Sequence, residues 1–482
     1  MSLTSSLNNA LTGLAATQRL AEVTSSNISN ALTDGYGRRE LVLSSQSIGG
    51  QGAGVKIEGV SRQVDPVILS DRRLAGAELS QRQMRSDTFS RIEQIVGVPG
   101  DGTGLSARLV AFETALVAAS SDPASTSRLS VAVNRLGELT GALNQATRDL
   151  QTMRQEADAQ IATAVETLNT SLRQIEELNG DIARANIIGG DPSALEDQRQ
   201  RAVDKIAELV PVREVKRDNG AIALYSTSGA TLLDGKAGLF TFGRTPTISA
   251  DMTFAAGSLS GIEYNGTPLD PSNGFGRLSG GGLEAAFETR DNFAVEAQSG
   301  LDFIAADLIT RFENPVNDPS LFPGDPGLLT DNGAIYDVSI IEGLAGRIQI
   351  NSVVDPILGG DATRLRDGVG AAVPGPVGDA TQINRWIASL QNTATPDASL
   401  IPTSANGRIS DLGDQIGTQR VVADENAAFT AARWDSLRQS ELANGVDTDQ
   451  EMQKLLLIEQ AYAANAKLIQ TVSSMIQTLM EI

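Results

Sequence analysis

The chain of 482 residues contains no cysteine and no histidine. This excludes disulfides, thiolate nucleophiles and imidazole bases, and with them nearly all zinc sites. Carboxylates, lysine, tyrosine, serine and threonine remain for chemistry. Aromatic residues make up only 4% of the sequence, which disfavours large aromatic cores. We assign no catalytic, cofactor-binding or metal-binding residue from the sequence.

Positive charge and long apolar runs are also scarce. The formal net charge is -21, which argues against a nucleic-acid partner and disfavours an anionic membrane surface. No run approaches the ~18–20 apolar residues of a membrane span. Residues 1–25 lack the basic start and apolar core of a cleaved signal peptide. The sequence therefore predicts a cytoplasmic protein or one exported without a cleaved signal.

The last stretch, residues 447–482, has no glycine or proline and organises the rest of the chain. Thr448 and Glu451 predict a capping box, in which the hydroxyl accepts from a backbone N–H and the glutamate reaches back. Two apolar stripes follow at helical spacing, one with Tyr462, Ala466, Ile469 and Ile476, the other with Leu468, Met475 and Leu479. A helix lying on a globule needs only one stripe, so the second predicts contacts with other chains.

Residues 3–28 repeat this apolar pattern, with Leu7, Leu11 and Leu14 among its members. The helix is followed by a segment rich in asparagine, aspartate and glycine, in which Gly35 is a candidate for positive φ. We therefore expect the two terminal helices to pair with each other and with neighbouring subunits.

The interior is mainly helical in its periodicity. Helices are predicted over residues 66–97, 105–120, 192–209, 283–313, 380–390 and 409–444, with short extended pieces at 40–45 and 54–60 and a turn at 97–104. The longest helix follows Pro123, with Ser125 or Thr126 as its cap. Sixty helical residues give a rod of roughly 90 Å. Long antiparallel rods suit a structural part better than a catalytic pocket.

A small β domain interrupts this helical interior. Short strands are predicted at residues 212–215, 221–225, 231–233, 239–242, 252–254 and 261–264, with further strands at 336–341 and 347–350. The predicted fold is mainly α, with a β insertion and nested domains. The domains are a terminal-helix coiled-coil core (1–35 with 446–482), a long-helix bundle (36–210 with 282–445) and the inserted β domain (211–281).

Two motifs were weighed as ligand sites. Residues 280–282 are three glycines before a helix, which is a possible phosphate cradle, but the Lys-Ser/Thr of a P-loop is missing. Asp318, Asp325 and Asp331 lie in a Pro- and Gly-rich loop, but their spacing does not match an EF-hand. Ordinary turn and loop roles are the favoured interpretation for both.

Both ends resemble the flagellar axial protein family. The signature near the start is Asn27-Ile28-Ser29-Asn30-Ala31-Leu32-Thr33-Asp34-Gly35-Tyr36, with Asp34 where many relatives have proline. The matching stretch near the other end is Tyr462-Ala463-Ala464-Asn465-Ala466. Two interior segments resemble the hook-associated protein 1 branch of that family. They are Ser121-Asp122-Pro123-Ala124-Ser125 and Gly282-Leu283-Glu284 through Arg290-Asp291.

This resemblance implies a structural subunit of the bacterial flagellum and not an enzyme. It implies assembly with copies of itself at the distal end of the hook, between the hook protein and hook-associated protein 3, which connects to the filament. It also implies flagellar type III export to the cell exterior, with an export chaperone on the C-terminal helix. The implied subunit-interface residues are Leu7, Leu11, Leu14, Asn27, Ile28, Asn30, Gly35, Tyr36, Tyr462, Ala466, Leu468, Ile469, Met475, Ile476 and Leu479.

Other functions remain open on the sequence alone. A hook or rod subunit shares these ends but would have a mainly β interior. A secreted enzyme on an axial scaffold would use carboxylates of residues 314–380. A coiled-coil adhesin would need a membrane anchor or a signal peptide.

Overall fold

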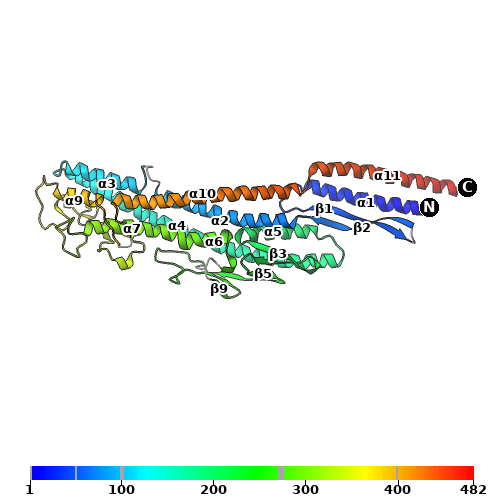
Figure 1. Cartoon of the computed structure of the whole chain (residues 1–482), viewed down its shortest axis with the longest axis horizontal. Helices are drawn as coiled ribbons and strands as arrows, with labels where there is room; N and C mark the ends of the chain where they lie inside the picture. Colours follow the sequence, from blue (N-terminus) through cyan, green and yellow to red (C-terminus); the bar gives the residue numbers. More distant parts are fainter. Residues whose placement is uncertain (1–2, 49–50, 98–101, 270–275, 398–399, 482) are drawn as a thin grey trace.

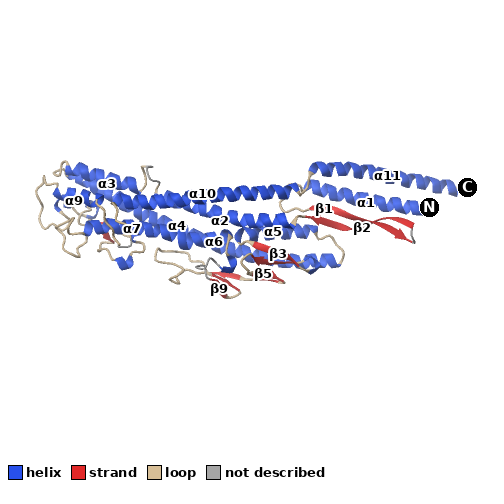
Figure 2. Cartoon of the chain, viewed as in Figure 1, coloured by secondary structure: helices blue, strands red, loops and turns tan. Residues whose placement is uncertain are grey.

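The protein is an elongated, mainly helical molecule whose two ends lie together at one extremity (Figure 1). The computed structural model describes residues 3–48, 51–97, 102–269, 276–397 and 400–481. Short strands gather beneath the middle of the rod, and two longer strands lie beside the terminal helices (Figure 2). The predicted fold class, mainly α with a β insertion, is confirmed. Across the described residues, no helix combines the length and hydropathy needed to cross a bilayer.

The helices predicted from periodicity are present. Their bounds are α1 (Leu3–Ser29), α2 (Pro66–Val96), α3 (Leu105–Ser120), α4 (Thr126–Ile187), α5 (Ser193–Leu209), α6 (Gly281–Glu288), α7 (Ala294–Glu313), α8 (Arg364–Asp367), α9 (Thr381–Gln391), α10 (Ala405–Ala443) and α11 (Thr448–Met480). A π-helical turn over Thr289–Phe293 joins α6 to α7. Ser125 caps α4, because its hydroxyl accepts from the N–H of Arg128 at 3.4 Å. Of the turn predicted at 97–104, residues 98–101 lie outside the described part of the chain.

The strands form four small antiparallel sheets. The hairpin β1 (Arg38–Ile48) and β2 (Gln51–Gln63) lies along α1, and β10 (Leu329–Asp331) pairs with β11 (Ile348–Ile350). Two sheets belong to the insertion, and their strands are β3 (Val212–Lys216), β4 (Ile222–Ser226), β5 (Thr231–Asp234) and β6 (Lys236–Ala237) in one, and β7 (Phe240–Phe242), β8 (Ile262–Tyr264) and β9 (Thr267–Leu269) in the other.

Two predicted strands are wrong. Residues 252–254 lie in an irregular loop, because the guanidinium of Arg154 donates to the carbonyl oxygens of Ser249 (3.1 Å) and Met252 (2.5 Å). Residues 336–341 contain a 3₁₀ turn, because Asp337 caps it by accepting from the N–H of Ser339 at 2.9 Å. In both places a side chain bonds to the backbone and holds it in a loop or turn.

One helix, α4, supplies the wall of two apolar cores. Its first part, from Leu129 to Met153, packs with residues of α2, α3, α7, α9 and α10. Its later part, from Ile161 to Ile175, packs with α5, α6 and the two sheets of the insertion. The inserted strands therefore rest on the same helix as the rest of the body, which explains their place beneath the middle of the rod in Figure 1.

A buried charged layer separates the two cores on α4. Arg154, Asp158 and Arg290 are each 0% exposed. Arg290 donates to Asp158 at 2.7 Å, and Arg154 donates to the carbonyl oxygen of Arg290 at 2.8 Å. Burial lowers the pKa of Arg154 to about 10, so its guanidinium still carries a charge at neutral pH. Because buried charges are tolerated only when paired and hydrogen-bonded, this layer fixes the register of α4 against the π-helical turn.

Two carboxylates of α7, the buried Asp302 and the partly buried Glu313, hold the irregular segment that follows this helix. Asp302 accepts from the backbone N–H groups of Gly343 and Ala345, both at 2.8 Å, and burial raises its pKa to about 6. Glu313 accepts from the N–H of Tyr336 at 2.9 Å. Burial, with a smaller contribution from the negative charge of Asp331, raises the pKa of Glu313 to about 7.

We predict that Glu313→Gln stabilises the protein at pH 8 more than at pH 5. The pKa of Glu313 is higher in the folded state than its ordinary value, so its favourable contribution is complete below pH 4.5 and is lost as pH rises through about 7. Glutamine keeps the acceptor for Tyr336 and removes this loss. Calorimetric unfolding should show a midpoint a few degrees above the parent at pH 8. Glu342→Gln, at an exposed position nearby, is the control, and an equal gain at both pH values would contradict the prediction.

Candidate functional site

The two terminal helices, α1 and α11, lie side by side at one end of the molecule (Figure 1). The buried positions on α1 are small or polar: Ala10, Ala16, Thr17, Val23, Thr24 and Asn27. Gly13 faces Asn465, and an added Cβ there would lie 3.0 Å from the amide of that asparagine. Small residues therefore let the two backbones approach closely, and many of the larger apolar side chains lie outside this contact.

Most of the large apolar side chains of α11 are uncovered. Among its described residues, only Glu451 and Val472 are buried. We call the uncovered set the terminal apolar face, and it comprises Leu11 of α1 with Met452, Leu456, Leu457, Tyr462, Leu468, Met475, Leu479 and Met480 of α11. Leu468 is 54% exposed and Leu479 is 61% exposed. Extended exposed apolar surface of this kind marks an interaction site.

The residues predicted for the subunit interface fall into three groups. Uncovered on the terminal apolar face are Leu11, Tyr462, Leu468, Met475 and Leu479. Partly buried on the two helices are Leu7, Leu14, Ala466, Ile469 and Ile476. The remaining five, Asn27, Ile28, Asn30, Gly35 and Tyr36, lie where the terminal helices meet the body. The structure thus divides the predicted set among an exposed surface, a partly buried layer on the two helices and an internal joint.

Asn27 is the centre of that joint and is 1% exposed. Its Oδ1 accepts from the N–H of Arg39 and from the hydroxyl of Tyr36, both at 2.9 Å. Its Nδ2 donates to the carbonyl oxygen of Arg39 at 2.8 Å and to Glu451 at 3.1 Å. Gly35 has φ of 76°, a conformation that favours glycine and turns the chain back toward α1. The end of α1, the start of β1 and the start of α11 are therefore joined through one asparagine.

The predicted capping box at the start of α11 is wrong. Asp447 caps the helix instead, because its carboxylate accepts from the N–H groups of Asp449 (2.9 Å) and Gln450 (3.1 Å). Glu451 is then free to turn inward, where it pairs with Arg38 at 3.0 Å and Lys454 at 3.0 Å. Burial acts to raise the pKa of Glu451, but hydrogen bonds from Asn27, Lys454 and Arg38 outweigh it and lower the pKa.

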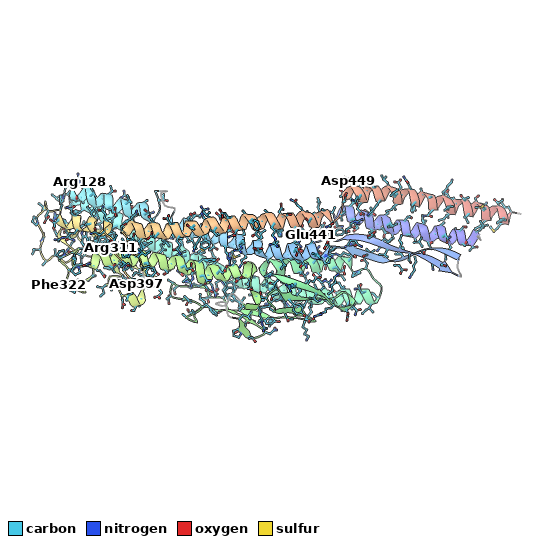
Figure 3. All side chains as sticks on the ribbon, in the orientation of Figure 1. Arg128, Arg311, Phe322, Asp397, Glu441 and Asp449 are labelled. Carbon is cyan, nitrogen blue, oxygen red and sulfur yellow. The ribbon has the colours of Figure 1, made fainter. Side chains whose placement is uncertain are left out.

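A second carboxylate, Asp197 of α5, fastens the hairpin to the body. It accepts from the N–H of Gly37 at 3.0 Å, from Arg39 at 3.0 Å and from Arg62 at 2.7 Å. Arg62 also donates to Gln200 of α5. Nearby, Arg72 of α2 pairs with both Asp204 of α5 and Glu441 of α10. Glu441 and Asp449 mark the end of α10 and the start of α11 on either side of the joint (Figure 3).

The sequence did not indicate most of the charged residues at this joint. Arg38 and Arg39 directly follow the recognised signature, so their position was the available signal. Asp197 gave none, because a lone aspartate on an amphipathic helix is ordinarily solvated. Glu451 was noticed, but for a local role in place of its contact with Asn27, which is 424 positions away.

The other motifs have structural roles. An added Cβ at Gly281 would overlap the carbonyl oxygen of Leu209, and Glu284 already accepts from the N–H of Gly280 at 2.5 Å, so the three glycines make a close turn. Asp318 bonds to Ser320 and Val369, Asp325 to Phe322, and Asp331 to Arg347. Within the described residues, no three metal-binding side chains converge.

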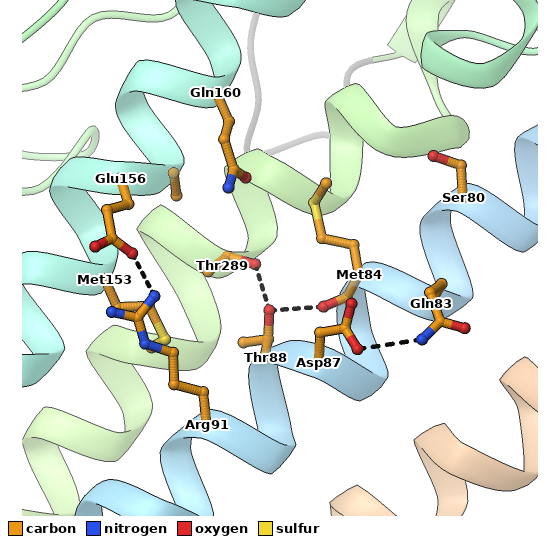
Figure 4. A pocket seen from close by; sticks show the side chains of 11 residues that line it. Ser80, Gln83, Met84, Asp87, Thr88, Arg91, Met153, Glu156, Gln160 and Thr289 are labelled. Carbon is orange, nitrogen blue, oxygen red and sulfur yellow. Dashed lines mark hydrogen bonds and ion pairs between the residues drawn. The ribbon is translucent and has the colours of Figure 1, made fainter.

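A pocket of about 370 Å³ lies between α2, α4 and the π-helical turn (Figure 4). Most of its polar side chains are bonded to one another (Figure 4). Thr88 pairs with Thr289 at 2.9 Å, Gln83 donates to Asp87 at 3.1 Å, and Arg91 pairs with Glu156. These interactions leave no pairing of a nucleophile with a base, so the terminal apolar face and its joint remain the candidate functional site.

Known proteins match both the ends and the interior. The family model of the flagellar hook-associated protein FlgK helical domain matches residues 89–318. The model of the flagellar basal body rod FlgEFG protein C-terminal region matches residues 442–482, and that of the flagella basal body rod protein matches residues 7–36.

Several relatives carry the name flagellar hook-associated protein 1. The one from Salmonella typhimurium is 30% identical over 246 residues, which are 48% of this chain and 43% of the relative, so the match spans less than half the relative's length. That of Bacillus subtilis is 23% identical and covers 96% of this chain and 95% of the relative. That of Escherichia coli K12 is 24% identical and covers 100% of both. A solved structure, the flagellar hook junction protein FlgK from Burkholderia pseudomallei, aligns with a TM-score of 0.45 and 21% identity over 55% of this chain and 47% of that one.

The two terminal matches coincide with the helices that carry the apolar face and the joint, and they define a structural protein of the bacterial flagellum. The interior match covers α3 to α7 of the helical body and is to the helical domain of a hook-associated protein. The interior match, the named relatives and the sequence motifs all indicate that this chain is similar to flagellar hook-associated protein 1.

We predict that Asp197→Asn loosens the hairpin without unfolding the body. Two guanidinium groups, of Arg39 and Arg62, would then face a neutral amide, and removing one partner of a buried ion pair costs about 3–5 kcal/mol. Hydrogen exchange followed by mass spectrometry should show faster exchange across residues 38–63 and unchanged exchange in α4. The control is Glu177→Gln, at an exposed position on α4. Unaltered exchange in the hairpin would contradict the anchoring role of Asp197.

Proposed function

We propose that this protein is a structural subunit of the hook–filament junction, which assembles at the distal end of the hook and connects to the filament through hook-associated protein 3. The observation that carries the proposal is the terminal apolar face. It is carried by segments that match flagellar rod proteins, and the chain's own body leaves it uncovered. A structural subunit has a use for such a surface, because assembly covers it.

Copies of this same chain are the first proposed partners, in a ring or helical layer. Burying a leucine or methionine side chain contributes about 1.5–3 kcal/mol, and the face offers several per copy. The hook protein on one side and hook-associated protein 3 on the other are the further partners. The protein works in this proposal without catalysis or a cofactor, and it contacts neither nucleic acid nor membrane.

The proposed domain division follows the predicted boundaries with one adjustment. Residues 1–35 with 446–482 form the terminal-helix domain, residues 36–210 with 282–445 the long-helix bundle, and residues 211–281 the inserted β domain. Because the hairpin over residues 38–63 lies along α1, we propose that it acts with the terminal helices. Residues 270–275 of the β domain lie outside the described part of the chain.

We further propose that the protein reaches the cell exterior through the flagellar type III export channel, without cleavage of a signal peptide. Lack of cysteine suits a chain that is threaded unfolded, since no disulfide can form on the way. Before export, the apolar residues of α11 would promote aggregation. We propose that an export chaperone binds this helix before export and prevents the aggregation.

We predict that replacing both Leu468 and Met475 by aspartate blocks incorporation at the hook tip. Leu468 is 54% and Met475 is 43% exposed, so the monomer should remain folded, while carboxylates on the terminal apolar face should oppose burial between copies. Incorporation is measured by electron microscopy and immunolabelling of hooks, and folding by circular dichroism. The matched control is the apolar exchange Leu468→Met with Met475→Leu. Normal filaments on cells that carry the aspartate variant would overturn the proposal.

A further inference from the structure

The polar joint fixes the start of α11 through buried hydrogen bonds to elements that are distant in the sequence. Glu451 lies in the first turn and is 2% exposed. It receives hydrogen bonds from Asn27 of α1 (3.1 Å) and Arg38 of β1 (3.0 Å), which lie more than 400 positions away in the chain. Among the described residues after Glu451, Val472 is the buried one. The intramolecular anchoring of α11 is therefore concentrated at its body end.

The terminal apolar face begins directly beyond this anchor. Met452, next to Glu451, is 51% exposed, and further apolar positions follow to Met480. α1 approaches the same point from the opposite direction, since Asn27 lies two residues before its end at Ser29. The body ends of both helices thus meet at one buried polar contact, while their outer parts are held by buried small or apolar residues, such as Ala10 and Val472, and by partly buried side chains.

We propose that Glu451 is a positioning residue, which together with Asn27 makes α1, β1 and α11 order as one unit from the body outward. This inference rests on the proposed function, because it states how the terminal apolar face is presented for assembly. In this proposal, Glu451 and Asn27 set the orientation of the terminal apolar face. Leu468 and its apolar neighbours make the contacts with other subunits.

The chemistry of the contact explains why these two residue types are needed. Asn27 must donate with its nitrogen to Glu451 and to the carbonyl oxygen of Arg39 while its oxygen accepts from Tyr36. A carboxylate at position 27 would face the carboxylate of Glu451 and could not donate. Glu451 in turn carries the negative charge that Arg38 and Lys454 pair with.

Hydrogen exchange with mass spectrometry on the full chain tests this proposal. In the parent, amide protection should be strong in residues 22–29 and 448–456 and decline toward the outer ends of both helices. Glu451→Ala should speed exchange about tenfold or more in both segments and at 38–44, because the loss of one partner leaves the others unpaired. Glu459→Gln, at an exposed position on α11, should change nothing. Faster exchange in α11 alone would overturn the idea of one unit, and so would an unprotected joint in the parent.

A reciprocal exchange distinguishes positioning from a general loss of stability. Asn27→Asp should be as damaging as Glu451→Ala, since two carboxylates would then meet. Adding Glu451→Gln to Asn27→Asp restores one donor and one acceptor across the contact, so protection in residues 448–456 should partly return. A double variant no better than Asn27→Asp would overturn the assignment. These readouts require no flagellum, so a failure here can be told apart from a failure of the junction proposal, which the hook-tip assay measures.

Discussion

A helix of 62 residues must be covered along its apolar face, and the arrangement of the body follows from how α4 meets that need. The helix is stabilised mainly by burial of its leucine and isoleucine side chains, and this stabilisation would be lost if they were exposed to water. α3 and α7 cover its first part, while α5, α6 and the inserted sheets cover its later part. The β domain is therefore more than an appendage, because it completes the second core.

Apolar contacts alone allow packed helices to slide along one another. A buried charge is stable only next to a specific partner, so it fixes the position of one helix against the other. The structure places such charges where register matters. Arg154, Asp158 and Arg290 lie between the two cores, Asp197 lies between hairpin and body, and Glu451 lies between the terminal helices. Each of these groups bonds to an element distant in sequence. The adhesive surface is thereby carried at a defined orientation on a long support.

Periodicity predicted the helices well, because an apolar stripe at three- and four-residue steps reports burial on one side wherever the chain folds. The strands at 252–254 and 336–341 failed because side chains, from Arg154 and Asp337, decide the backbone there. The same limit explains the joint. Asn27 and Tyr36 were found through a resemblance, but nothing local in the sequence indicates that Asp197 or Glu451 would be buried against arginines more than 100 positions away.

The signature near the start of the chain has Asp34 where the resemblance leads one to expect proline, and the geometry of the joint shows what that position requires. Asn27, Gly35 and Tyr36 are fixed by hydrogen bonds or by positive φ. The side chain of Asp34, in contrast, is 91% exposed and makes only a 3.6 Å ion pair with Arg438 of α10. Proline or aspartate can both begin a turn that points to solvent. The departure therefore leaves the buried contacts intact, and the signature is best understood as the chemistry of the joint, with position 34 outside it.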